Sequence, residues 1–121
     1  MIEIAIDGPA ASGKGALGKK LSDKYNFPYL DTGILYRKVA YELIKNNIKN
    51  SEKLEILCCN FAKNLNMKET TNKNLRTEDV AKLASKIATF PNLRKILNNK
   101  QKEFSNFNKK QFGGCILDGR D

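Results

Sequence analysis

The chain has 121 residues, of which 40% are hydrophobic and 29% are charged, which favours one small packed domain and argues against wholesale disorder. No apolar run approaches the ~20 residues that a membrane-spanning helix needs, and the N-terminus lacks the basic region of a secretion signal, so we expect a cytoplasmic protein. The net charge of +9 suggests an anionic partner, but the lysines that dominate it are spread along the chain.

The first predicted elements alternate between strand and helix. Residues 2–6 form an apolar run that predicts a buried parallel strand, and a glycine-rich segment separates it from a helix over residues 14–25 with Leu17 and Leu21 on one face. Residues 27–31 predict a second strand, after which Thr32 can cap a helix that reaches residue 46. This order is typical of an α/β domain with a parallel sheet.

The middle of the chain is predicted to be helical. Apolar stripes indicate one helix over residues 51–65, capped by Ser51, and another from a capping Thr77 to a break at Phe90-Pro91. The polar segment 66–76 between them is typical of turns. A further stripe begins at Leu93 and continues to Phe104, so we expect a third helix there.

The last predicted strand covers residues 115–119 and, like the first, ends in Asp-Gly. The chain stops at Asp121, immediately after this strand. A parallel sheet of only three strands would leave a hydrophobic edge open. We therefore expect the chain to be the N-terminal fragment of a longer protein.

A phosphate-binding loop is predicted between the first strand and the first helix. The pattern G-x-x-x-x-G-K starts at Gly8 and ends at Lys14. In such a loop the backbone N–H groups and the helix N-terminus surround phosphate oxygens, and the lysine reaches the β and γ phosphates. The alternative is an ordinary glycine-rich turn with a surface lysine. The predicted site contains Gly8, Pro9, Ala10, Ala11, Ser12, Gly13, Lys14, Gly15 and Ala16.

The chain has three cysteines, Cys58, Cys59 and Cys115, and no histidine. These are too few ligands for a zinc site, and Ser-His and Cys-His nucleophilic schemes are excluded. We expect buried structural thiols, with catalysis or redox sensing as the alternatives.

The sequence resembles the bacterial cytidylate kinase family. The resemblance rests on four segments in the family's order, IAIDGPAASGKG at 4–15, YLDTGILYR at 29–37, RTEDVAKLASKIATFPNLR at 76–94 and ILDGRD at 116–121. It implies a P-loop kinase fold, with three layers around a parallel sheet that is incomplete here and a helical monophosphate-binding insertion. The implied domains are a first core part over 1–48, the insertion over 49–95 and a return to the core over 96–121.

The resemblance also implies a reaction, the transfer of the γ-phosphoryl group of ATP to CMP or dCMP, giving ADP and CDP or dCDP. The acceptor is a phosphate oxygen that is already anionic near neutral pH, so no general base is required. Positioning and charge neutralisation would carry catalysis. Mg²⁺ would be bound with ATP and not by direct protein ligands, and three cationic side chains would assist, Lys14, Arg37 and Arg120.

By the same resemblance, Arg37 and Arg120 would hold the acceptor phosphate through the planar guanidinium fork. Asp31 and Thr32 would face the same crevice from a strand end, where α/β sheets bind ligands. Two alternatives stay open. Arg37 could be a surface charge, and Asp31 could be a helix-capping carboxylate.

The resemblance assigns recognition of the cytosine edge to Ser85, Arg94 and Asp121. A carboxylate and an arginine together distinguish the amino donor and ring acceptors of cytosine from uracil. As alternatives, Arg94 could be a solvated helix residue and Ser85 a small packing residue. We expect Arg76 to be a surface charge.

Two departures from the family pattern affect activity. Ala16 stands where the family usually has Thr, and a lost hydrogen bond to a charged group costs roughly 1.5–3 kcal/mol. Family members also continue past the last motif into a lid with further arginines. Residues 1–121 alone should therefore turn over at least ~10³-fold more slowly than a complete enzyme.

Two other functions remain open on the sequence alone. One is a basic nucleic-acid-binding module, which would need lysines on one face and interleaved stacking aromatics. The other is a P-loop kinase with another small acceptor. We expect a monomer that binds small nucleotides and neither nucleic acid nor membranes.

Overall fold

The computed structural model describes residues 2–6, 14–48, 52–68 and 72–118. The elements in these ranges confirm the predicted alternation, and a 3₁₀ helix is added in the polar segment. They are β1 (Ile2–Ile6), α1 (Lys14–Tyr25), β2 (Tyr29–Asp31), α2 (Gly33–Lys45), α3 (Leu54–Lys63), η1 (Lys73–Arg76), α4 (Glu78–Ile87), α5 (Pro91–Phe112) and β3 (Gly114–Asp118). No helix in the described ranges is long and apolar enough to cross a membrane.

The chain divides into two compact units. The core unit consists of Met1–Gly33 and Gln101–Asp121, and the helical unit is Ile34–Lys100. Helix α2 therefore belongs to the helical unit, whereas the sequence-based division groups it with the first 48 residues. Two hydrogen-bonded side chains of α2, Arg37 and Lys38, hold backbone carbonyls of the segment before α4, which accounts for this grouping.

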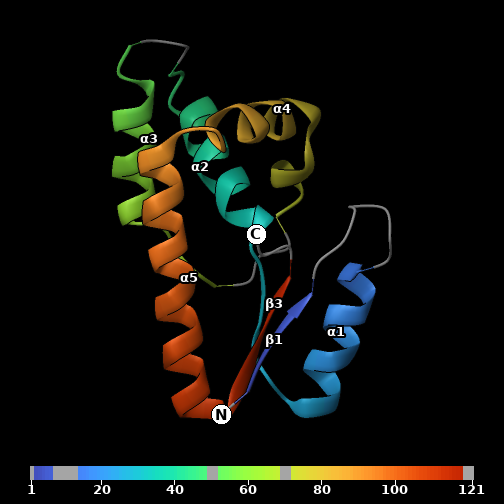
Figure 1. Cartoon of the computed structure of the whole chain (residues 1–121). Helices are drawn as coiled ribbons and strands as arrows, with labels where there is room; N and C mark the ends of the chain where they lie inside the picture. The colour runs from blue at the N-terminus through green and yellow to red at the C-terminus, as the bar shows by residue number, and fades with distance from the viewer. Residues whose placement is uncertain (1, 7–13, 49–51, 69–71, 119–121) are drawn as a thin grey trace. The chain divides into compact units, whose positions relative to one another are not determined.

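The three strands form one parallel sheet, as predicted, and their order in it is β1-β3-β2. Ile4 pairs with Ile116, and Asp31 pairs with Asp118 at the carboxyl end. The central strand β3 is buried along its whole length. Within the core unit, α1 lies on one side of the sheet and the C-terminal half of α5 on the other (Figure 1). This arrangement gives the three layers of the expected fold class.

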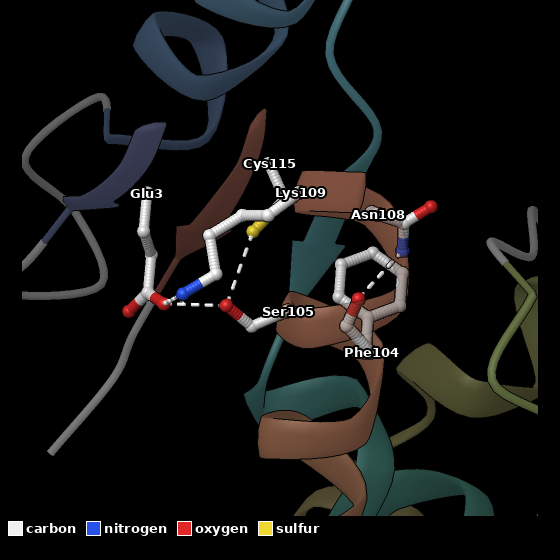
Figure 2. Close-up of polar contacts among 6 residues, drawn as sticks. All are labelled: Glu3, Phe104, Ser105, Asn108, Lys109 and Cys115. Atoms are coloured by element: carbon white, nitrogen blue, oxygen red, sulfur yellow. Dashed lines mark hydrogen bonds and ion pairs between the residues drawn. The ribbon is translucent and has the colours of Figure 1, made fainter. Parts of the chain in front are cut away.

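A polar cluster joins α5 to the opposite end of the sheet (Figure 2). The buried Ser105 hydroxyl donates to the Glu3 carboxylate at 2.5 Å and accepts from the Cys115 thiol at 3.6 Å. Lys109 Nζ lies 3.5 Å from the same Glu3 oxygen, and one turn away the Asn108 amide donates to the Phe104 carbonyl. Because Glu3 and Cys115 are paired across β1 and β3, the cluster fixes α5 to both strands.

Helix α5 ends at a glycine that turns the chain directly into β3. Gly113 has φ +83°, a left-handed conformation that glycine adopts without a steric penalty. Its N–H donates to the Lys109 carbonyl, and its own carbonyl accepts from the N–H of Ile2. The turn thereby sets the start of the β1–β3 ladder.

The helical unit is built on apolar stripes that mostly follow the prediction. In this unit α3 and the first part of α5 run side by side in the same direction, tied by Glu55 to the N–H of Asn92 and by Lys100 to the Lys63 carbonyl. Burial of these stripes in a close-packed interior stabilises the unit. Its fully buried apolar residues are Leu35, Val39, Ala40, Leu43, Cys58, Ala62, Ile87, Leu93 and Leu97.

Several local predictions need correction. Helix α3 begins at Leu54 after Lys53, which makes no side-chain cap, and the predicted cap Ser51 lies outside the described residues. In α1 the buried position is Gly18, while Leu17 is 51% exposed, because a ring from β2 packs against Gly18. Thr77 does cap α4 as predicted, through the N–H of Val80.

Candidate functional site

The candidate site begins at the carboxyl end of the sheet. Ile6, Asp31 and Asp118 are the last residues of their strands, and all three lie level in the register. In α/β folds, ligands bind outside this end of the strands. The chain leaves β1 here through the predicted phosphate loop, and α1 starts at Lys14.

Asp118 is a buried carboxylate at this edge, with only 2% of its surface exposed. Tyr29 Oη donates to its Oδ2 at 2.5 Å. Its backbone carbonyl accepts from both the N–H and the hydroxyl of Thr32, each at 2.8 Å. A buried polar group needs such partners to offset the loss of water. The side chains of Tyr29 and Thr32 therefore hold the end of β3 from the neighbouring strand.

Asp31 also lies at this edge, where it is half-buried. Its Oδ1 accepts from the N–H of Gly33 at 3.1 Å, at the start of α2. This contact confirms the capping role that the sequence left open for Asp31. Asp31 is also the register partner of Asp118. Two carboxylate residues are therefore adjacent on neighbouring strands.

Arg37 lies in the helical unit on α2, where it is half-buried. Its Nη1 donates to the Leu75 carbonyl of η1 at 3.1 Å, so the alternative of a solvated surface charge is wrong. The next residue, Lys38, donates to the Asn66 and Lys68 carbonyls, and burial lowers the pKa of its ammonium. Consecutive cations of α2 thus hold both parts of the segment between α3 and α4.

Beside Lys38 the helical unit has an open groove of about 610 Å³. Aromatic, amide and charged side chains line it, in a mixture that does not define a ligand class by itself. The lining residues are Lys38, Tyr41, Glu42, Phe61, Asn64, Leu65, Asn66, Lys68, Asn72 and Leu75.

Of the three residues expected to read the base, Asp121 lies outside the described residues, and the other two are exposed. Ser85 lies on the outer side of α4, so the packing alternative does not fit it. Arg94 is exposed near the start of α5, and its Nη1 donates to the Ala88 carbonyl at 3.4 Å. Arg76 is exposed, as expected for a surface charge.

Part of the predicted site lies outside the described residues. This applies to the loop from Gly8 to Gly13 and to Arg120 and Asp121. Lys14 and Gly15 form the start of α1, and Ala16 is exposed in its first turn.

Sequence reasoning missed Asp118 and Tyr29 as site residues. A signal for Asp118 was present, because an Asp-Gly pair closes the apolar run of the third strand and another directly follows that of the first, and the ends of parallel strands lie at one edge. Tyr29 gave no comparable signal, since its position in a half-buried strand is also typical of a packing residue.

The cysteines fit a structural role. All three are free and buried. Burial raises the pKa of the Cys58 thiol to about 11, with smaller contributions from Cys59 and Glu55, and burial likewise raises the pKa of Cys59. In the described ranges, no three or more metal-binding side chains come together.

Comparison with known proteins covers nearly the whole chain. The family model of cytidylate kinase matches residues 4–121. Proteins named cytidylate kinase are 42% identical in Bartonella tribocorum, 40% in Bradyrhizobium diazoefficiens and 38% in Acinetobacter baumannii, each over 98% of this chain. The match covers 52–56% of those proteins, so the chain spans about half the length of the curated relatives it matches. On these grounds the chain belongs to the cytidylate kinase family.

Proposed function

We propose that the full-length protein transfers the γ-phosphoryl group of ATP to CMP or dCMP. The observation that carries the proposal is the carboxyl edge of the sheet. There β1 leads into a G-x-x-x-x-G-K segment and α1, and Asp31 and Asp118 stand side by side on the next two strands. In the reaction the bond between the γ-phosphorus and the ADP oxygen breaks, and a new bond forms to an oxygen of the acceptor phosphate.

The protein's part in this proposal is positioning and charge neutralisation. The backbone N–H groups of the Gly8–Ala16 segment, which all its residues except Pro9 carry, would hold the ATP phosphates, and Lys14 would neutralise charge on the transferred group. Arg37 and Arg120 would hold the acceptor phosphate. Since Arg37 already donates to a single carbonyl, it retains further N–H donors for a phosphate.

Recognition of the acceptor would involve five further residues. Asp31 and Thr32 would face the acceptor from the edge of the sheet, and Ser85, Arg94 and Asp121 would read cytosine. The exposure of Ser85 and Arg94 supports a role in contacting a ligand. We propose that residues 49–95 serve as the monophosphate-binding part.

Mg²⁺ is the cofactor that this reaction implies, and the residues at the sheet edge fit it. Mg²⁺ keeps several waters and is usually held by one or two carboxylates together with substrate phosphates. Asp31 and Asp118, adjacent in register, are carboxylates that could accept hydrogen bonds from those waters. When bound with ATP, the ion neutralises charge on the β and γ phosphates. Asp31 and Asp118 would orient its waters.

The test is CDP formation from ATP and CMP by the purified full-length protein, beside a panel of other monophosphates. We expect CMP or dCMP to be preferred to UMP and AMP. Preference for another acceptor would contradict the proposal. Steeply salt-dependent binding to RNA or DNA without CMP binding would favour the nucleic-acid module.

The same assay with residues 1–121 alone tests the contribution of a lid. If the arginines of the family's lid are required, this piece forms CDP at least ~10³-fold more slowly than the full-length protein. Equal rates would show that these residues are self-sufficient.

A further inference from the structure

We infer that Tyr29 is a positioning residue whose hydroxyl holds the Asp118 carboxylate for the hydrated metal ion of the nucleotide. The inference rests on the proposed function and extends it to a residue that does not itself touch the substrate. Its structural basis is a contact between three elements of the core unit, α1, β2 and β3.

The hydrogen bond between Tyr29 and Asp118 joins residues of neighbouring strands that lie two residues apart in the register. Tyr29 is the first residue of β2 and pairs with Ile116, whereas Asp118 pairs with Asp31, two residues further on. The phenol covers this distance and places Oη 2.5 Å from Oδ2. Since Asp118 is 2% exposed, bulk water cannot replace this donor freely.

The ring of Tyr29 also has a defined place on α1. A Cβ atom built at Gly18 would lie 2.3 Å from Cε2 of the ring, closer than non-bonded carbons approach. Gly18 therefore provides the space that the ring occupies. This explains why Gly18 is buried while Leu17 beside it is exposed.

Together these contacts fix the carboxylate relative to the helix that starts at the phosphate loop. The ring packs on the second turn of α1, whose first residue is Lys14, and the hydroxyl orients Asp118. Hydrogen bonds that orient the ligands of a metal ion typically affect metal affinity or activity by 10–100-fold, and because Asp118 would contact the ion through its waters, we expect an effect at the lower end of this range. A tyrosine that only filled space would have no such effect through its hydroxyl.

The deciding variant is Tyr29→Phe in the full-length protein, because it keeps the ring and removes only the hydroxyl. Calorimetric titration would measure binding of ATP with Mg²⁺ and with EDTA. We expect affinity for the Mg²⁺ complex to fall about 10-fold, with less than a twofold change for metal-free ATP. We also expect kcat to fall by a similar factor, with KM for CMP unchanged.

Ser105→Ala is the matched control. It removes a hydroxyl that donates to a different carboxylate, the half-buried Glu3, at the opposite end of the same sheet. We expect it to lower the melting temperature without changing the difference between Mg²⁺-bound and metal-free ATP. If Tyr29→Phe behaves in the same way as Ser105→Ala, Tyr29 is a packing residue and the inference is overturned.

Gly18→Ala is the second variant, and it decides the question if Tyr29→Phe does not fold. The added methyl displaces the ring and keeps the hydroxyl, so we expect a smaller loss in the same Mg²⁺-dependent affinity. An unchanged affinity would overturn the inference. Absence of phosphoryl transfer to CMP by the unmodified protein would instead contradict the proposed function, and the two failures are thus distinguishable.

Discussion

The two ends of the core sheet each hold a hydroxyl that donates to a carboxylate, and their surroundings differ. At the carboxyl end Tyr29, whose ring packs against Gly18 of α1, donates to Asp118. At the other end Ser105 donates to Glu3, which also pairs with Lys109 on α5 (Figure 2). The first carboxylate belongs to strand ends where α/β folds bind ligands, and the second joins a helix to the sheet. Similar chemistry should therefore affect catalysis at one end and stability at the other.

The largest expected effect is that of Lys14→Met, at the start of the helix that follows the carboxyl end of β1. In the proposed mechanism Lys14 neutralises charge on the transferred phosphoryl group, so its removal should lower kcat by at least ~10³-fold. If Lys14 acts on the bound nucleotide and not on the fold, the melting temperature should stay within about 2 °C of that of the unmodified protein. Steady-state CDP formation and thermal melting measure the two quantities, and unchanged turnover would remove Lys14 from the mechanism.

Arg37→Met extends the comparison to the helical unit. Loss of the guanidinium should lower kcat/KM for CMP by about 100-fold, because the proposed charge-assisted contact to the acceptor phosphate is lost. Arg37→Lys keeps the charge but not the planar fork, and should recover only part of the loss. If both variants bind CMP normally, the bond of Arg37 to the Leu75 carbonyl is its whole role.

Glu3→Ala tests the other end of the sheet, where Glu3 joins β1 to α5. It leaves the buried Ser105 hydroxyl and the half-buried Lys109 ammonium without their shared acceptor, which should lower the free energy of unfolding by about 2 kcal/mol. Urea denaturation measures the change. KM for CMP and KM for ATP should not change. A selective change in either would show that the Glu3 end of the sheet also affects substrate binding, which would contradict the comparison.

The smallest expected effect concerns Cys58 and alkaline pH. Its folded-state pKa of about 11 lies above the ordinary thiol value of 9.0, so the native state keeps a proton that the unfolded state releases. This contribution to stability is complete below pH 9 and is lost as the pH rises from 9 to 11. Melting temperatures across this range should fall more steeply for the unmodified protein than for Cys58→Ala. Equal slopes would show that the thiol titrates alike in both states.

Much of the fold could be predicted because β3 and most of the helices bury clear apolar patterns. The first strand was expected to be buried as well, but only Ile6 of β1 is buried. The runs IEIAI and CILD were assigned to parallel strands, and the stripe Val80, Ala84 and Ile87 to a buried helix face. Pattern alone misplaced the inner face of α1, because a tertiary contact from Tyr29 decides that Gly18 is buried.

Less of the candidate site could be predicted from the pattern of apolar and polar residues in the sequence. The strand-end position of Asp31 was predictable, since a carboxylate directly after an apolar run lies at the edge of the sheet. The partners of Arg37 and Asp118 were not, because each is joined to a residue far away in sequence, Leu75 and Tyr29 respectively. Local periodicity contains no information about such pairs.

The core unit is made of two segments that are far apart in the sequence. This separation affects how the chain folds as it is synthesised. Ile2 pairs with Gly114, so β1 emerges from the ribosome more than a hundred residues before its neighbour in the sheet. At ~5–20 residues per second this interval is about 6–22 s. Residues 34–100 are continuous, so the helical unit can fold within that time from shorter-range contacts. β1 meanwhile remains an unpaired apolar segment for a chaperone to shield.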